Sequence, residues 1–232
     1  MVNGVGNIPG VGILGAVATP PPRRREEYSE ASRRALLDSA RSRFETLGFT
    51  ATSLDQVAAD ARLTKGAVYH HFASKKALFE AVLDEVEDET MAMIAAAAAG
   101  KPSARESGLA GLDAFLERCL DPGYQRICFQ EGPVALGFLE WWAKGAQREM
   151  SLVDGLVRAL ADEGRIDTDH LDTLTELLFG SLFAGAFSIA RSKNPVATRD
   201  AVRQVVVRLI EGMHPAVTPW LAETVAGEEP GR

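Results

Sequence analysis

The sequence predicts an all-α protein, and three observations support that fold class. Apolar residues recur at helical spacing along most of the 232 residues. Runs of β-branched residues are scarce, and the main one, Val205–Val207, lies within a helical pattern. Serines and threonines suited to capping helix N-termini precede several apolar runs. We therefore expect an N-terminal domain of three helices that contains a helix-turn-helix, followed by a C-terminal helical domain.

The beginning of the chain has a different composition from the rest. Residues 1–22 contain no charged side chain, are rich in glycine and end in three prolines, and Arg23, Arg24 and Arg25 follow directly. We expect residues 1–25 to form a disordered tail with a basic end, and no signal peptide, because no basic segment precedes the apolar runs. The arginines could reach DNA as an arm or form a solvated run before a helix, and the sequence leaves both open.

The first helix is predicted over Ser29–Leu47. Its apolar stripe consists of Ala35, Leu36, Ala40, Phe44 and Leu47. Gly48 follows as a C′ residue, a position where glycine commonly ends a helix. We expect the stripe to pack behind the segment that comes next.

That segment, Thr52–Phe79, has the sequence TSLDQVAADARLTKGAVYHHFASKKALF and predicts two short helices and the start of a third. Thr52 or Ser53 is the expected N-cap of the first helix, Thr64 that of Lys65–His71, and Ser74 that of the third. Two helices joined by a turn of about three or four residues form a helix-turn-helix, whose second helix enters the DNA major groove.

The second of these short helices has an inward and an outward face. Val68 and Phe72, four residues apart, are expected to face inward. Small residues on the outward face would let the helix approach base edges, while cations, hydroxyls and helix N-termini can bind phosphates. The predicted DNA contacts are Thr52, Ser53, Thr64, Lys65, Gly66, Ala67, Tyr69, His70 and Lys75. The alternative is three short helices of an ordinary core.

The remainder of the chain also follows helical periodicity. The first of its helices should connect the two domains mechanically, and Gly164 should cap the end of the fourth. The expected segments are Lys75–Ala99, Ser107–Leu120, Tyr124–Gln130 (a short helix or turn), Val134–Ala161, Thr168–Ser192 and Thr198–Met213.

The stretch Thr52–Phe79 resembles the N-terminal DNA-binding domain of TetR-family (tetracycline-repressor-like) bacterial regulators. The residues that match the family pattern in place are Thr52, Ser53, Val57, Ala58, Leu63, Thr64, Gly66, Val68, Tyr69, His71, Phe72, Ser74, Lys75 and Leu78. One departure is Arg62, because the family usually has glycine in the turn. A non-glycine residue near the left-handed conformation costs about 1 kcal/mol. The resemblance covers roughly Ser29–Val86.

The resemblance implies four segments: the tail 1–25, a helix-turn-helix domain over 26–86, a ligand-binding and dimerisation domain over 87–214, and a C-terminal tail over 215–232. In such proteins the last two helices pair with their copies across a two-fold axis. The interface residues expected here are Leu174, Leu178, Ser181, Gly185, Val202, Val205, Val206 and Leu209. Packing within one chain is the alternative for these residues.

The resemblance also implies an effector pocket among the later helices, and aromatic residues gather there. Pockets are mostly apolar with a few converging polar groups. The expected lining residues are Phe115, Cys119, Tyr124, Phe129, Trp141, Trp142, Phe179 and Phe183, and the polar candidates are Arg126, Gln130, Glu131 and Arg191. Each aromatic residue could equally belong to an ordinary core, but as a set they suggest a hydrophobic or aromatic effector.

Charge and cysteine content fit a DNA-binding protein of the cytoplasm. The net charge is −7, yet residues 23–80 hold 11 Lys and Arg against 8 Asp and Glu, while residues 81–232 hold 14 against 24. Cys119 and Cys128 have no metal or redox spacing, so a reducing compartment is expected. No apolar run of about 18 residues predicts a membrane span. No catalytic, metal or cofactor motif is present, so we expect no enzyme.

The sequence thus predicts a repressor that binds a palindromic double-stranded operator as a homodimer and is released by a small hydrophobic or aromatic effector. One alternative is an activator of the same fold. Another is a helical small-molecule-binding protein or enzyme that retains a vestigial DNA module. The effector, the operator and the regulated genes do not follow from the sequence.

Overall fold

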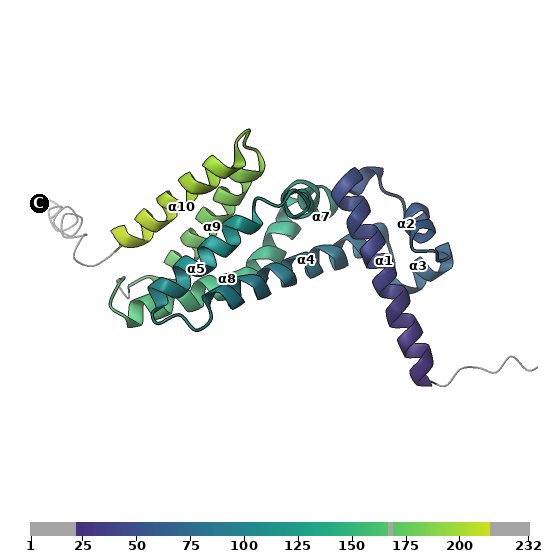
Figure 1. Ribbon diagram of the computed structural model, residues 1–232, viewed down its shortest axis with the longest axis horizontal. Helices are drawn as coiled ribbons and strands as arrows, with labels where there is room; N and C mark the ends of the chain where they lie inside the picture. The colour runs from purple at the N-terminus through teal and green to yellow at the C-terminus, as the bar shows by residue number, and fades with distance from the viewer. Residues whose placement is uncertain (1–21, 167–168, 214–232) are drawn as a thin grey trace, which may run out of the picture.

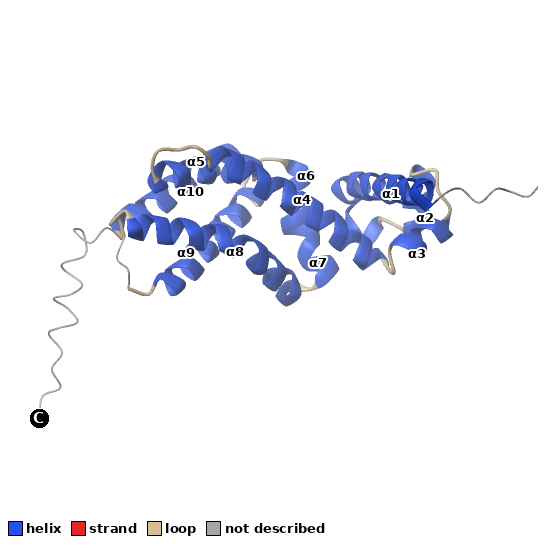
Figure 2. Ribbon diagram, turned by 90° about the horizontal axis from the view of Figure 1, so that it is seen from below, coloured by secondary structure: helices blue, strands red, loops and turns tan. Residues whose placement is uncertain are grey.

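The helices fall into two groups along the long axis of the molecule (Figure 1). The computed structural model describes residues 22–166 and 169–213, and every regular element in these residues is a helix (Figure 2). One group consists of α1 (Pro22–Ala51), α2 (Leu54–Asp60) and α3 (Lys65–His71). From this end α4 (Lys75–Ala98) runs into the second group. The second group consists of α5 (Ala104–Arg118), α6 (Pro122–Tyr124), η1 (Gln125–Glu131), α7 (Gly132–Leu136), α8 (Phe138–Asp162), α9 (Leu171–Ala190) and α10 (Pro195–Gly212).

Helix α1 is longer than predicted at both ends. It begins at Pro22 rather than Ser29, so the prediction that the disordered tail extends to residue 25 is wrong for the backbone of residues 22–25. Proline suits a first helical position, because the N–H that it lacks would be unpaired there. Residues 1–21 lie outside the described residues. Gly48, with φ of 85°, kinks the helix as a left-handed residue must, and one further turn follows to Ala51.

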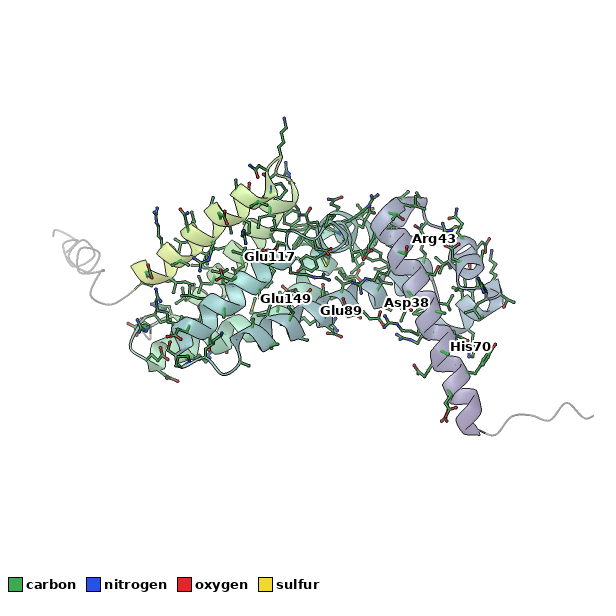
Figure 3. All side chains as sticks on the ribbon, viewed as in Figure 1. Asp38, Arg43, His70, Glu89, Glu117 and Glu149 are labelled. Atoms are coloured by element: carbon green, nitrogen blue, oxygen red, sulfur yellow. The ribbon has the colours of Figure 1, made fainter. Side chains whose placement is uncertain are left out.

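The first group of helices closes around aromatic side chains of α1 and α4. Phe44 and Phe79 are fully buried and meet edge to face, with ring centroids 5.0 Å apart. Ion pairs fix the same helices at the surface: Arg43 Nε lies 2.6 Å from Asp60 Oδ2 of α2, and Arg41 Nη1 lies 2.7 Å from Glu89 Oε1 of α4. One residue of each ion pair, Arg43 and Glu89, is labelled in Figure 3. The helix-turn-helix is therefore attached rigidly to the connecting helix.

The segment between α5 and α8 differs most from its prediction. The expected turn or short helix Tyr124–Gln130 is α6 followed by η1, a π-helix that runs to Glu131. The expected helix Val134–Ala161 is divided at Gly137, whose φ of 87° is incompatible with a continuous helix. The break predicted at Glu131-Gly132-Pro133 falls where η1 ends and α7 begins, whereas the break at Gly137 was not predicted. Gly164 does cap α8, with φ of 67°.

The second group is a bundle in which α8 packs on α9, α9 on α10, and α5 on α4, α8 and α10. Helices α9 and α10 were predicted with their boundaries a few residues out. Among the described residues α9 is the one helix long and apolar enough to cross a membrane. One such helix is weak evidence, since a core helix passes the same test, and α9 lies between α8 and α10.

Candidate nucleic-acid interface and effector cavity

Side-chain caps define the helix-turn-helix. Ser53 accepts a hydrogen bond from the backbone N–H of Gln56, and the Gln56 side chain accepts one from the Ser53 N–H, which forms a complete capping box at the start of α2. The Thr64 side chain accepts a hydrogen bond from the Ala67 N–H at the start of α3, and the Ser74 side chain accepts one from the Ala77 N–H at the start of α4. All three caps were predicted from the sequence and are confirmed.

The turn between α2 and α3 depends on a left-handed residue. Arg62 has φ of 56°, and the Leu63 N–H donates to the Ala58 carbonyl at 2.9 Å, which closes the end of α2. The sequence comparison with the family pattern placed a left-handed conformation here, and the structure confirms it. Arg62 is exposed, and it adopts this conformation at the energetic cost that a non-glycine residue carries there.

Helix α3 presents the outward face that the sequence predicted. Val68 is fully buried, whereas Lys65, Gly66, Tyr69 and His70 are exposed, and Tyr69 keeps 51% of its surface accessible. Figure 3 shows His70 at this end of the molecule, away from the helical domain. Lys65 Nζ lies 2.8 Å from Asp55 Oδ1 of α2, an exposed pair that a phosphate could replace.

Two of the predicted DNA contacts have structural roles instead. Thr52 is 2% exposed, and its hydroxyl donates to the Gly48 carbonyl at 2.8 Å, so the prediction of a DNA contact by its side chain is wrong. Lys75 Nζ donates to the carbonyls of Phe49 and Thr52 at 2.8 and 2.9 Å and lies 4.4 Å from the centre of the Phe49 ring. Lys75 thereby binds the carbonyl end of α1, where cations are favoured, and its ammonium group holds the kinked end of α1 against the start of α4.

The helical domain contains a cavity of about 460 Å³ among α4, α5, α8, α9 and α10. Of the predicted lining residues, Phe115, Phe179 and Phe183 line this cavity. The remaining five do not: Cys119, Tyr124, Phe129, Trp141 and Trp142 pack in the core beside it. The polar candidates Arg126, Gln130, Glu131 and Arg191 are also absent from the lining.

Sequence reasoning missed most of the lining. Met91 and Ile94 of α4 and Leu156 of α8 line the cavity, although their spacing is that of any buried helix face. The polar lining residue Glu149 was missed as well, because nothing in its local sequence separates it from a surface carboxylate. Figure 3 places Glu149 within the helical domain. Burial raises the pKa of Glu149 to about 7.

Helix η1 lies between this domain and the helix-turn-helix. On one side, the ring of Phe129 in η1 packs against the ring of Phe183 in α9, with the two centroids 5.6 Å apart. At the other side, Glu131 Oε2 accepts the Phe49 N–H at 2.8 Å, and Arg126 Nη1 donates to the Thr46 carbonyl at 3.1 Å. The π-helix thus joins the aromatic core next to the cavity to the kinked end of α1.

The expected interface residues on α9 and α10 divide into two sets. Leu178 and Val206 are buried and line the cavity, and Gly185 is buried against Val202, so these four residues pack within the chain. Leu174 packs in the core cluster around Val157. Val205 and Leu209 are exposed, and Leu177 and Val196, which were not predicted, are exposed on the same two helices. Ser181 is partly exposed.

No group of three or more His, Cys, Asp or Glu residues that could hold a metal ion occurs in the described part of the chain. Cys119 and Cys128 are both buried and unpaired, and burial raises the pKa of each thiol. Thiols with raised pKa values are poor nucleophiles, which fits a place in the core.

Two family models match the chain. One, described as bacterial regulatory proteins of the tetR family, matches residues 36–82, and the other, described as a tetracyclin repressor-like C-terminal domain, matches residues 105–213. The first match contains the helix-turn-helix, and the second contains α5 to α10 except the first residue of α5. Together they span more than half of the sequence.

Individual relatives agree with the family models. The Transposon Tn10 TetC protein of Escherichia coli is 28% identical over 160 residues, which are 67% of this chain and 79% of that protein. The HTH-type transcriptional repressor KstR2 of Rhodococcus jostii is 32% identical over 120 residues, 51% of this chain and 54% of that one. A crystal structure of a TetR-family transcriptional regulator from Pectobacterium atrosepticum has a TM-score of 0.72 at 28% identity, and covers 82% of this chain and 97% of that chain.

Proposed function

Because this chain belongs to the TetR family of DNA-binding transcriptional regulators, most of which are repressors, we propose that it is a cytoplasmic repressor. It binds a palindromic operator as a homodimer and leaves the DNA when a small hydrophobic effector enters the cavity. The family and the relatives named above are regulators rather than enzymes.

The exposed face of α3 is the observation that carries this proposal. Its first turn offers Lys65 and the small residue Gly66, and its second offers Tyr69 and His70, while Val68 anchors the opposite face. A helix with small residues at its start can approach base edges in the major groove, and the polar residues behind them can bind phosphates. The capped N-terminus of α2 at Ser53 supplies further backbone N–H groups toward the same surface.

The cavity supports the effector part of the proposal. Its volume lies within the range of about 300–1,000 Å³ that small-molecule sites occupy. Thr90, Met91 and Ile94 of α4 line it, and the same helix begins at Lys75, directly after α3. An effector that binds more tightly when α4 is displaced would therefore shift the position of α3. Effector binding and DNA binding are then coupled, because the effector has different affinities for the two conformations.

The exposed face of α9 and α10 supports the dimer. Leu177 keeps 65% of its surface accessible, and Val205 and Leu209 are also exposed. Two-fold pairing of this face would bury these side chains and place the two α3 helices to read successive major grooves about 34–36 Å apart.

The test uses fluorescence anisotropy of the full-length protein on the intergenic DNA upstream of its own gene, across a salt series. We expect sequence-dependent binding whose affinity falls steeply with salt, because phosphate contacts release counterions. Tyr69→Ala and Lys65→Ala should each weaken binding by about tenfold or more, corresponding to loss of about 1–3 kcal/mol. Lys101→Ala is the matched control, since Lys101 is exposed at the far end of α4 and should not contact DNA.

Equal affinity of wild type, Lys65→Ala and Tyr69→Ala for every DNA tested would contradict the assignment of α3 as the recognition helix. If the upstream DNA binds no better than random DNA, genomic fragments selected on the protein replace it in the same comparison.

A further inference from the structure

The cavity in the helical domain is apolar except at a few positions. Methionine, leucine, isoleucine, valine and phenylalanine side chains from five helices make up most of its lining. Polar side chains reach it from six positions among the described residues: Thr90, Arg105, Ser107, Glu149, Ser151 and Glu211. The chemistry of a ligand that binds here depends on which of these six has hydrogen-bonding capacity to spare.

Five of the six polar side chains have a hydrogen-bond or ion-pair partner within the chain. The Thr90 hydroxyl donates to the Val86 carbonyl at 2.8 Å, and the Ser107 hydroxyl donates to the Ala98 carbonyl at 3.2 Å. Ser151 Oγ lies 3.5 Å from the Arg148 carbonyl. Arg105 Nη2 and Glu211 Oε1 pair with each other at 2.8 Å.

Glu149 is the exception. Its carboxyl group makes no hydrogen bond and no ion pair with any described residue, although it lines the cavity. The neighbouring Arg148 points elsewhere: its Nη1 lies 2.6 Å from Asp84 Oδ1, and its Nη2 lies 3.1 Å from Asp88 Oδ1. A carboxyl group that lines an apolar cavity without a partner in the chain has free hydrogen-bond acceptors for a ligand.

A second buried carboxyl group lies near Glu149. Glu87 of α4, one turn before the lining residue Thr90, is 5% exposed, and its Oε2 has no hydrogen-bond partner. The nearest cation to that oxygen is Arg148 Nη1, at 3.5 Å. Lys144 and Arg148 both pair with Asp84, and Arg148 also lies 3.1 Å from Asp88, so these two cations are already matched by aspartates. None of these four residues lines the cavity, whereas Glu149 does.

We propose that the effector is an apolar molecule carrying one basic amine, and that its ammonium group pairs with Glu149. This assignment rests on the proposed function, since it specifies what the cavity of the regulator binds. The apolar part of the molecule would lie against the leucines and phenylalanines of α5, α8 and α9. Phe115, Phe179 and Phe183 could also present ring faces to the cation.

Binding of an amine should be linked to a proton. Burial raises the pKa of Glu149 to about 7, so below this pH the free protein holds the carboxyl in its protonated form. Pairing with an ammonium ion requires the carboxylate, so one proton leaves Glu149 for solvent at low pH. Affinity should therefore fall by up to about tenfold per pH unit below 7 and level off above it. The other groups that face Glu149 electrostatically are Arg148, Glu87, Cys119, Tyr124 and Cys128.

The experiment compares ligands that share a hydrocarbon skeleton and differ only in the polar group attached to it. The probes are 1-adamantanemethylamine, 1-adamantanemethanol and 1-adamantaneacetic acid, together with decylamine, decanol and decanoate. Binding to the full-length protein is followed by tryptophan fluorescence. Trp142 serves as the reporter, because its ring centroid lies 4.7 Å from that of the lining residue Phe183. Each titration is repeated between pH 5.5 and 8.5, and by calorimetry at one pH.

In the adamantane series, the decyl series or both, the amine should bind at least tenfold more tightly than the alcohol. The carboxylate should bind most weakly. Glu149→Gln should remove the preference for the amine and its pH dependence while retaining alcohol binding, which shows that the variant is folded. Asp162→Asn, an exposed carboxylate on the same helix, is the matched control and should keep the preference.

An alcohol or carboxylate that binds as tightly as the amine, or an amine preference that survives Glu149→Gln, would overturn the proposal. So would failure of all amines to bind a sample that binds operator normally. Operator affinity is measured by anisotropy in the same preparations. If sequence-dependent DNA binding is absent while the amine preference is present, the regulatory function fails and the ligand assignment stands, so the two failures are distinguishable.

Discussion

Glu87 is a buried carboxyl group in α4 with one oxygen that has no hydrogen-bond partner. Burial, and secondarily the charge of Glu149, raise its pKa from the ordinary 4.5 to about 8. The folded protein therefore binds this proton more tightly than the unfolded chain. The resulting stability is fully present below about pH 4.5 and is lost as the pH rises through 8, where the folded state must hold a buried charge.

Replacing Glu87 by glutamine should abolish this loss. Between pH 5 and 9 wild type should lose about 2–4 kcal/mol of unfolding free energy more than Glu87→Gln, so the variant becomes the more stable protein at the alkaline end. Urea unfolding at fixed protein concentration across this pH range measures the difference. Asp162→Asn is the control and should follow wild type. Parallel curves for wild type and Glu87→Gln would contradict a raised pKa.

For single residues, the sequence predicts local features such as helix caps better than it predicts which side chains contact DNA or a ligand. Ser53, Thr64 and Ser74 were predicted as caps because capping depends on local chemistry that a short segment contains. Thr52 and Lys75 were placed among the DNA contacts, but their polar atoms bind backbone carbonyls of α1, which are distant in sequence from Lys75. Glu149 could not be found at all, because its significance comes from its place in the cavity lining, which only the packing of distant helices creates.

Among the elements, the contact between η1 and α1 joins the two domains. Gly48 is central to it: a Cβ at this position, where φ is 85°, would lie 2.9 Å from the Cδ of Glu131, whose Oε2 accepts the Phe49 N–H. The left-handed conformation and the lack of space both require glycine here.

Gly48→Ala should lower the unfolding free energy by about 1–3 kcal/mol, through backbone strain and displacement of Glu131. Thermal or urea unfolding measures this. Gly145→Ala, in α8 where a Cβ meets no atom within 4 Å, is the matched control and should be neutral or more stable by up to about 1 kcal/mol. Wild-type stability in Gly48→Ala would show that the contact does not constrain the kink.

The helices were predicted where the apolar residues repeat at helical spacing over several turns. Helices α4, α5, α9 and α10 were each identified with small boundary errors, because their apolar stripes extend over several turns. The division at Gly137 and the π-helix η1 were missed. A single glycine is compatible with a helix interior, and a π-helix has no distinct pattern in sequence, so tertiary packing decides both.

At the scale of the whole molecule, α9 and α10 carry exposed apolar side chains in the part of the chain that the structure describes. Leu177, Val205 and Leu209 keep between 47% and 65% of their surfaces accessible. Exposed apolar residues gathered on two adjacent helices mark interaction surfaces more often than isolated ones do. The sequence named two of these three residues, but also five that pack within the chain. Periodicity shows that a helix face is apolar, and it does not show whether that face packs inside the chain or against a partner.

Leu177→Glu should convert the proposed dimer to a monomer, because a carboxylate would be buried opposite its own copy across the two-fold axis. Light scattering after size-exclusion chromatography measures the mass, and operator affinity should fall by about tenfold or more as the second half-site contact is lost. Leu139→Glu, at a residue that is 81% exposed on α8, is the control and should leave the mass unchanged. A dimeric Leu177→Glu would exclude this face.

The most direct measurement is selection of genomic DNA fragments on the purified full-length protein, followed by sequencing of the bound fraction. The account predicts that the enriched fragments share an inverted repeat whose half-sites lie about one helical turn apart, as two copies of α3 related by a two-fold axis require. It also predicts that Tyr69→Ala enriches no such sequence. Fragments without a shared motif, or a motif that Tyr69→Ala recovers equally well, would contradict the claim that this protein reads DNA through α3.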